Sequence, residues 1–248
     1  MNETIRLLQA HHSSRSYKTD PIPDGVLEAI IESARRAPTS TNSHEISLVV
    51  VRNADSRARI AEIAGGQPWI ARAPVFIAVI ADLYKTGLGV KKAGAEQVFQ
   101  RTLEGILAAV SDAGIAMATL LTAARAFGLG VVPIGGIRRD PQAMIDLLRL
   151  PPNTFPVDGV VLGYVAEESP QKSRMAIESF CHEETYRPEV LKSAIDAYDR
   201  TLQEYWKKIG RVDGKSWSAN MAQHYGTFSR LIRSVAEKQG LHDRGVVG

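Results

Sequence analysis

A run of apolar residues constrains the fold more than any other feature of this chain. Val75–Ala81 reads VFIAVIA and lacks the polar residue at every second position that marks a strand with one face in water. We therefore predict a strand that is buried on both faces. The longest predicted helix spans 96–127, and its middle is rich in small residues nearly all round, which predicts burial in the core or between subunits.

Apolar spacing and turn residues divide the rest of the chain into alternating helices and strands. The further predicted helices span 23–38, 55–63 and 141–150, and the further predicted strands span 47–51, 131–134 and 160–165. After Pro188 the pattern is helical to the end, with a break at 210–215 and a C-cap at Gly240. The sequence thus predicts an α+β fold with a few strands, more helix and a helical C-terminal arm.

Composition narrows the classes of function. The chain has 248 residues, 44% of them hydrophobic and 23% charged, with a net charge of +3. This excess is small and scattered, which argues against nucleic acid as a partner. We find no N-terminal signal stretch and no apolar run of about 18 residues, so we expect no membrane span. The single cysteine, Cys181, excludes an internal disulfide and fits the cytoplasm.

Two polar clusters have the composition of an anion site. In an extended backbone, His11, Ser13 and Arg15 of the run HHSSR line one side, and together they offer the donors that an oxyanion needs. Lys172 and Arg174 repeat this alternation far along the chain. If both clusters converged they would hold a phosphate. A solvated polar segment is the alternative for the first cluster.

Three further motifs lie between these clusters. A hydroxyl-rich stretch at 37–43 follows the first long helix, a Gly-Gly-Gln turn occupies 65–67, and glycines recur at 128–136. Alone, the turn is an ordinary loop and the hydroxyl stretch a helix C-terminal turn. The glycines at 128 and 130 follow a helix and precede a strand, which is the reverse of a dinucleotide-binding motif. A metal site on the adjacent histidines 11 and 12 and a nucleophile at Cys181 both lack supporting residues.

The five motifs, in this order, resemble the nitroreductase family of FMN-dependent oxidoreductases, and its branch of oxygen-insensitive NADPH nitroreductases and flavin reductases. The resemblance covers essentially the whole chain. It implies a small central sheet surrounded by helices, with a helical C-terminal extension, in an intertwined homodimer. It further implies an FMN-binding core over 1–187 and a helical arm over 188–248 that contributes to the dimer and the NADPH site.

The resemblance also implies a set of cofactor residues. Arg15 would face the pyrimidine edge of the flavin and stabilise the negative charge that reduction places there. Gln67 would bond the O4/N3 edge of the ring, and glycines 135 and 136 would let the backbone approach it. The residues expected to bind FMN are His11, His12, Ser13, Arg15, Thr39, Ser40, Thr41, Gln67, Pro133, Ile134, Gly135, Gly136, Lys172 and Arg174. Thr39, Ser40 and Thr41 would contact flavin bound mainly by the partner subunit.

The chain departs from the family pattern at two positions. His12 stands where this branch usually has arginine, which lowers the fixed positive charge near the phosphate and makes FMN retention sensitive to pH if the ring titrates. His44 stands where an amide often follows the hydroxyl loop. A role carried over from the family to His44 is therefore not supported.

The implied reaction is a two-electron transfer by a ping-pong mechanism, from NADPH through FMN N5 to a small-molecule acceptor such as a nitroaromatic, a quinone or a flavin. No protein side chain is expected to act as a nucleophile. The residues expected to attract NADPH are Lys208, Arg211 and Lys215, although cations at a helix end look the same without any ligand. The alternatives are an FMN reductase that supplies a partner monooxygenase, and a non-catalytic flavin-binding or helical interaction protein.

Overall fold

The computed structural model describes residues 1–226 and 231–243. They divide into two compact units, one of residues 1–170 with 231–243 and one of residues 171–226. The predicted boundary between residues 187 and 188 lies inside the second unit and stays a prediction. The predicted helix toward the C-terminus falls partly on residues 227–230 and 244–248, which are outside the described residues.

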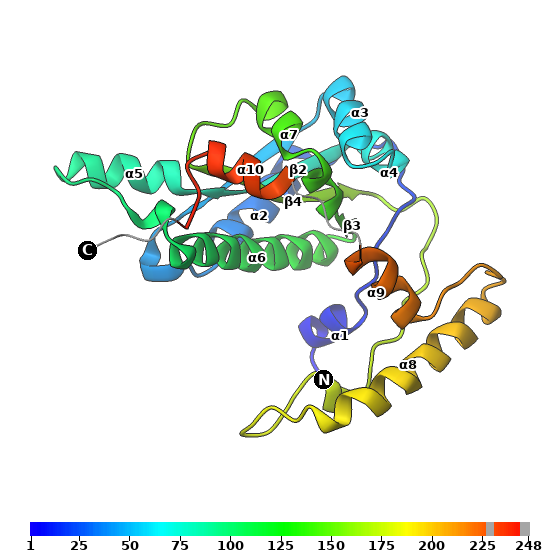
Figure 1. Cartoon of the computed structure of the whole chain (residues 1–248). Helices are drawn as coiled ribbons and strands as arrows, with labels where there is room; N and C mark the ends of the chain where they lie inside the picture. Colours follow the sequence, from blue (N-terminus) through cyan, green and yellow to red (C-terminus); the bar gives the residue numbers. More distant parts are fainter. Residues whose placement is uncertain (227–230, 244–248) are drawn as a thin grey trace. The chain divides into compact units, whose positions relative to one another are not determined.

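A four-stranded antiparallel sheet lies at the centre of the first unit, with the strand order β1-β2-β4-β3 (Figure 1). The strands are β1 (Ile46–Val51), β2 (Val75–Asp82), β3 (Gly130–Pro133) and β4 (Thr154–Gly163). β2 is buried at every position, which confirms the strand predicted from VFIAVIA. β4 begins six residues before the predicted strand 160–165, because Thr154, Phe155 and Pro156 also pair with the far end of β2.

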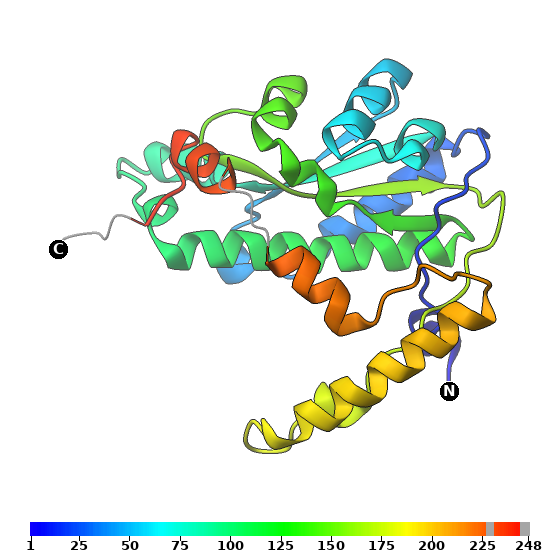
Figure 2. The same ribbon diagram turned by 45° about the vertical axis from the view of Figure 1, so that its right-hand side comes forward.

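The sheet separates two hydrophobic layers, because successive side chains of β2 point to opposite faces. Phe76, Ala78 and Ile80 pack into the cluster that includes α3, α4 and α7. Val75, Ile77 and Val79 pack into the cluster on the other face, against α2 and α6 (Figure 2). The helices of this unit are α1 (Glu3–Gln9), α2 (Asp24–Arg35), α3 (Ala54–Ile63), α4 (Pro68–Arg72), α5 (Leu83–Lys92), α6 (Leu103–Ala126), α7 (Pro141–Leu148) and α10 (Leu231–Lys238).

The long helix α6 begins at Leu103, so the predicted start near residue 96 is wrong. Thr102 has an extended backbone and its hydroxyl caps the helix by accepting from Gly105 N, while a short 3-10 turn (η2, Phe99–Arg101) precedes it. In the single chain α6 buries one face only, so burial of its other face between subunits stays a prediction.

α6 also corrects the expectation of no apolar run of membrane-spanning length. It contains an 18-residue window with a mean hydropathy of 1.7, so by length and composition it qualifies as a candidate span among the described residues. The core helix of a soluble protein passes the same test, and Ala113, Leu120 and Ala124 of α6 are buried against the sheet and α2.

The second unit is helical. It contains the helices α8 (Glu189–Lys208) and α9 (Trp217–Tyr225) and a short 3-10 turn, η4 (Ile177–Ser179). The gap between α8 and α9 confirms the predicted break at 210–215, and Trp206 Nε1 bridges it by donating to Lys215 O at 3.0 Å. The predicted cap at Gly240, in the first unit, also agrees with the structure, since Gly240 has a φ of +84° just after α10.

Candidate functional site

The first polar cluster runs as an extended segment beside β3. Ser14 N donates to Val131 O at 3.0 Å, and the buried Tyr17 hydroxyl donates to Ser14 O at 2.7 Å. Ser14 itself is buried and Arg15 is exposed, whereas residues 11–13 are all half-buried, so a common face for His11, Ser13 and Arg15 stays a prediction. Burial also raises the pKa of Tyr17 above its ordinary value, against the opposing effect of the Arg15 cation. Tyr17 therefore acts as a neutral hydrogen-bonded anchor for this segment.

Two segments that are distant in the sequence approach the turn that contains Gln67 and Trp69. The Arg15 guanidinium lies 5.6 Å from the centroid of the Trp69 ring, a cation–π distance. Gln67, in the same turn as Trp69, donates from Nε2 to Ala64 O at 2.9 Å. A Cβ at Gly136, at the start of the 3-10 turn η3 (Gly135–Arg139), would lie 2.6 Å from Gln67 Nε2. We call Arg15, Gln67, Trp69 and Gly136 the Arg15 cluster.

Local chemistry explains why the chain folds this way around Gln67. Gly65 and Gly66 have φ values of +88° and +77°, a left-handed conformation that glycine adopts without strain, and they end α3. Gln67 then precedes Pro68, which begins α4 at a position where a missing N–H costs nothing. The predicted tight turn is therefore confirmed, and it presents the Gln67 amide next to η3.

The residues of the Arg15 cluster fit the flavin that the family resemblance implies. Among the described residues, the buried Trp69 Nε1 has no hydrogen-bond partner, and Gly136 packs so closely against Gln67 and Ala64 that a Cβ would not fit there. Gln67 offers both a donor and an acceptor, and Arg15 is a permanent cation. Ile134 is buried, and its N–H donates to Gly159 O at 2.7 Å. This N–H is therefore already used within the chain. The contact of these residues with FMN stays a prediction.

His12 has partners of its own within the first unit. Its Nε2 lies 3.3 Å from a carboxylate oxygen of Glu168, and its Nδ1 lies 3.2 Å from Ala10 O. The expected phosphate contact of His12 thus competes with Glu168. His11 and Ser13 are half-buried beside it, and Ser13 O accepts from Arg15 Nη1 at 3.5 Å.

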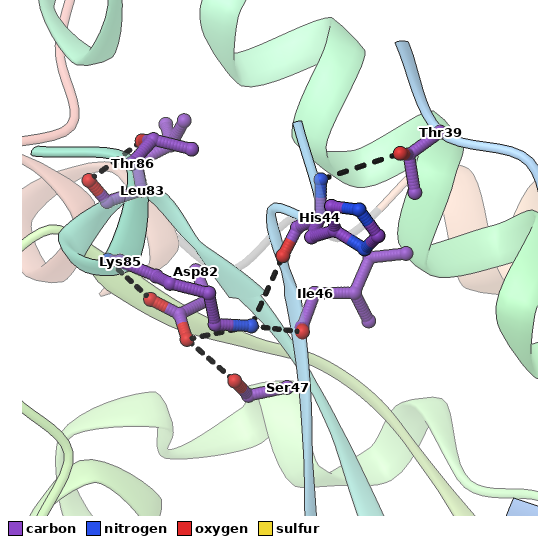
Figure 3. Close-up of polar contacts among 8 residues, drawn as sticks. All are labelled: Thr39, His44, Ile46, Ser47, Asp82, Leu83, Lys85 and Thr86. Atoms are coloured by element: carbon purple, nitrogen blue, oxygen red, sulfur yellow. Dashed lines mark hydrogen bonds and ion pairs between the residues drawn. The ribbon is translucent and has the colours of Figure 1, made fainter. Parts of the chain in front are cut away.

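The hydroxyl loop lies between α2 and β1 and is held in a strained conformation. Thr41, Asn42 and His44 have φ values of +50°, +56° and +54°, a left-handed backbone conformation that residues other than glycine rarely adopt. Ser40 N donates to Asp112 Oδ2 of α6 at 2.8 Å, and His44 N donates to Thr39 Oγ1 at 3.3 Å (Figure 3). Strain of this kind persists only where the surroundings over-determine it, and it concentrates at functional sites.

A lysine on α5 fixes the other end of this loop, and our sequence reasoning missed it. Lys85 Nζ donates to His44 O at 3.0 Å and to Ile46 O at 2.8 Å, and it lies 3.7 Å from Asp82 Oδ2 (Figure 3). Asp82 also accepts from the Ser47 hydroxyl at 2.5 Å. Apart from the neighbouring pair Lys85 and Asp82, nothing in the local sequence signals these contacts, because the partners lie 35 to 41 residues apart.

Two buried carboxyl groups lie beneath the loop. Asp112 is 5% exposed and Glu45 is 2% exposed, and Glu45 Oε1 has no hydrogen-bond partner among the residues that the structure describes. Burial raises the pKa of Glu45, and the Asp112 carboxylate raises it further. Asp112 did leave a sequence signal that we did not use, since it is the only charged residue of α6 between Glu104 and Arg125. Our candidates omitted both acids.

Glu45→Gln is expected to change the pH dependence of stability. Because the folded pKa of Glu45 lies above the unfolded one, its contribution to stability is complete below the unfolded pKa of about 4.3 and is lost as the pH rises through the folded pKa. The free energy of unfolding of the glutamine variant, relative to that of the original protein, should therefore rise between pH 4.5 and pH 8. Urea unfolding at several pH values measures it. Glu62→Gln, at an exposed acid on α3, is the control, and parallel pH profiles for all three proteins would refute the role of Glu45.

The second polar cluster belongs to the second unit, near α8. The Tyr198 hydroxyl of α8 donates to Ser173 O at 3.0 Å, and Arg174 Nη1 donates to Lys172 O at 3.1 Å. Lys172 Nζ lies 5.8 Å from the centroid of the Trp206 ring. Both cationic side chains belong to exposed residues. Their expected convergence with the first cluster stays a prediction.

The three cations expected to attract NADPH lie at the end of α8 and in the segment before α9. The Arg211 guanidinium lies 4.8 Å from the Trp206 ring centroid and its Nε donates to Asp213 Oδ1 at 3.1 Å. Lys215 Nζ donates to Gln223 Oε1 at 2.8 Å, whereas Lys208 is the exposed final residue of α8. Lys208 and Arg211 are thus near each other in the sequence, and both side chains are exposed.

Sequence comparison agrees with the fold and with the order of these motifs. The family model "Nitroreductase family" matches residues 8–164, and the model "Nitroreductase family, C-terminal domain" matches residues 172–244. The chain belongs to the nitroreductase family.

Individual relatives match nearly end to end. The chain is 39% identical over 246 residues to an FMN reductase [NAD(P)H] of Bacillus subtilis, covering 97% of this chain and 98% of the relative. It is 32% identical to an oxygen-insensitive NADPH nitroreductase of Salmonella typhimurium, again over 97% and 98%. Among solved structures, that of B. megaterium NfrA2 superimposes with a TM-score of 0.96 at 36% identity, covering 99% of this chain and 100% of the other.

Proposed function

We propose that this protein is an FMN-dependent oxidoreductase that takes two electrons from NADPH and passes them to a small-molecule acceptor by a ping-pong mechanism. The observation that supports it most directly is the Arg15 cluster, in which a permanent cation lies over the Trp69 ring and the Gln67 amide, two residues before Trp69, is approached closely by Gly136. FMN, when bound, supplies the capacity to accept and donate a hydride.

The residues of this chain have positioning and electrostatic tasks. Arg15 would stabilise negative charge on the pyrimidine edge of the flavin, and Gln67 would fix the orientation of the ring by donating and accepting at once. Lys172 and Arg174 would bind the phosphate by charge-assisted hydrogen bonds. The protein is accordingly expected to act by orienting the substrates against the flavin, and no side chain is expected to serve as a nucleophile.

We further propose that the active form is a homodimer in the cytoplasm. α6 carries the apolar side chains Leu103, Leu107 and Val110 at helical spacing, and they are 54%, 53% and 41% exposed in the single chain. A row of this kind on one helix face favours a covering partner. The hydroxyl loop, anchored to Asp112 on the same helix, would then reach the flavin bound by the other subunit. The lone cysteine fits a reducing compartment.

We propose free flavin as the preferred electron acceptor and nitroaromatics as the second, because of the activities for which two relatives are named. The relative at 39% identity is named as an FMN reductase and the one at 32% identity as a nitroreductase, which favours free flavin first and nitroaromatics second. Turnover of free FMN, of a nitroaromatic and of a quinone, each at the same NADPH concentration, ranks the three. A large preference for FMN would support supply of reduced flavin to a second enzyme.

A visible absorption spectrum tests the oxidoreductase proposal. The purified protein should show flavin bands that NADPH bleaches without oxygen and that an acceptor restores. Arg15→Ala should bind FMN more weakly and be bleached about a hundredfold more slowly, because a stabilising charge is lost where negative charge develops. A protein that FMN does not reconstitute would overturn the proposal. Bound flavin that NADPH leaves unbleached would support a non-catalytic flavin-binding protein.

Loss of the Lys208 and Arg211 side chains is expected to weaken the binding of NADPH and to leave the binding of NADH unchanged. In the Lys208→Ala/Arg211→Ala variant we expect the KM for NADPH to rise about tenfold or more, because two cations that pair with the 2′-phosphate are gone. The KM for NADH, which lacks that phosphate, and the flavin content should not change. Steady-state kinetics with both donors measures it, and Lys207→Ala on the same helix end is the control. An equal rise for both donors would contradict the assignment.

A further inference from the structure

A buried arginine on α3 has no role in the proposed reaction. Arg57 is 9% exposed, its Nη1 donates to the backbone oxygen of Arg52, and its Nε is buried without a hydrogen-bond partner. Within the part of the chain that the structure describes, no carboxylate forms an ion pair with it. Burial lowers the pKa of Arg57. A buried guanidinium without an anion is costly, and removing either member of a buried ion pair destabilises for this reason.

Arg57 borders a cavity of about 570 Å³ at the edge of the first unit. Its volume lies within the range of about 300–1,000 Å³ that is typical of small-molecule sites. The lining residues come from the segment that leads into α2, from the residue after β1, from the first turn of α3 and from the start of β2: Thr19, Pro21, Ile22, Pro23, Asp24, Arg52, Arg57, Pro74 and Val75. None of them is among the residues proposed to hold FMN or NADPH.

The charges around this cavity favour a negatively charged ligand. Its lining contains two arginines and one aspartate. The aspartate, Asp24, is already paired with Arg52 at 2.8 Å, and both are more than half exposed, so this pair lies at the rim. The uncompensated charge is therefore that of Arg57. The Thr19 hydroxyl supplies a further donor, whereas the proline rings, Ile22 and Val75 supply apolar walls.

We propose that this Arg57 cavity binds a small organic anion, with Arg57 paired to its carboxylate or phosphate group. The anion provides the counter-charge that the buried guanidinium lacks, and its oxygens would accept charge-assisted hydrogen bonds from the guanidinium. The apolar walls accommodate the rest of the molecule. The site is separate from the electron-transfer reaction, and it stands whether or not that reaction is as proposed.

Thermal unfolding of the FMN-loaded protein tests this proposal. Sodium phosphate, sodium acetate and sodium chloride are each titrated at constant ionic strength, and phosphate and acetate distinguish the two kinds of anionic group. We expect the melting temperature to rise by about 3–6 °C at an oxyanion concentration ten times the dissociation constant, and not to rise with chloride. Loading with FMN keeps the probe ions from binding where the flavin phosphate is expected.

Two variants on the same helix locate the effect. Arg57→Met keeps an unbranched chain of similar length and should lose the response, whereas Arg59→Met, at an exposed arginine paired with Glu62, should keep it. A response that survives in Arg57→Met, or that chloride reproduces, would overturn the proposal. Should Arg57→Met not fold, the Nε–H resonance of Arg57 in the original protein decides. It should shift with phosphate or acetate, and an unshifted resonance would refute the site.

Discussion

Replacing Lys172 and Arg174 together by alanine is expected to weaken FMN binding by at least about a hundredfold. A charge-assisted hydrogen bond contributes about 1.5–3 kcal/mol, so two such bonds to the phosphate correspond to about 3 kcal/mol or more. The backbone between them is anchored by Tyr198, which donates to Ser173 O at 3.0 Å. The fold of this segment should therefore survive the loss of both side chains.

The dissociation constant follows from the fluorescence that FMN regains when it leaves the protein on dilution. Lys192→Ala/Arg200→Ala removes the same charges from exposed positions of α8 and is the matched control. Because phosphate binding is electrostatic, the original protein and the control should lose FMN affinity at high salt more steeply than the double variant does. Equal flavin affinity in all three proteins would show that the phosphate is held by other residues.

The elements predicted correctly are those whose signal is local. β2 is apolar throughout, and the turn at Gly65 and Gly66 requires a backbone that glycine adopts readily. The helix α5 was missed because Gly87 and Gly89 interrupt its pattern, although the Asp82 side chain caps its start by accepting from Lys85 N. The start of α6 was misplaced because the backbone at Thr102, rather than the apolar spacing, decides where that helix begins.

The same division holds for the candidate site. Motifs with unusual local composition pointed to Arg15, Gln67 and the glycines of η3. In the structure Arg15 lies over Trp69, two residues after Gln67, and Gly136 approaches Gln67, although 52 and 121 residues separate Arg15 from Gln67 and Gly136. The residues that shape the hydroxyl loop were not found. Asp112, Lys85 and Glu45 act through partners elsewhere in the chain. The only sequence signal was the charge of Asp112 inside the apolar helix α6.

Gly136→Ala is the second variant for which we expect a large effect. A Cβ there would lie 2.6 Å from Gln67 Nε2 and 2.7 Å from Ala64 O, closer than real Cβ contacts. The Gln67 amide could move only by giving up its bond to Ala64 O, and that oxygen belongs to the backbone at the end of α3. We expect a loss of about 1–3 kcal/mol in the free energy of unfolding, as for other overpacked sites.

Gly135→Ala separates this clash from a general sensitivity of η3 to substitution. Its Cβ would meet the tip of the Arg138 side chain, 2.8 Å from Nη2, and no backbone atom is among its nearest contacts. Neither glycine has a positive φ, so backbone strain does not contribute to either change. Urea unfolding should show a small loss for Gly135→Ala and a large one for Gly136→Ala, with the flavin content of Gly136→Ala reduced because Gln67 is displaced. If Gly136→Ala retained both its stability and its flavin, the close approach of η3 to Gln67 would not be what shapes the Arg15 cluster.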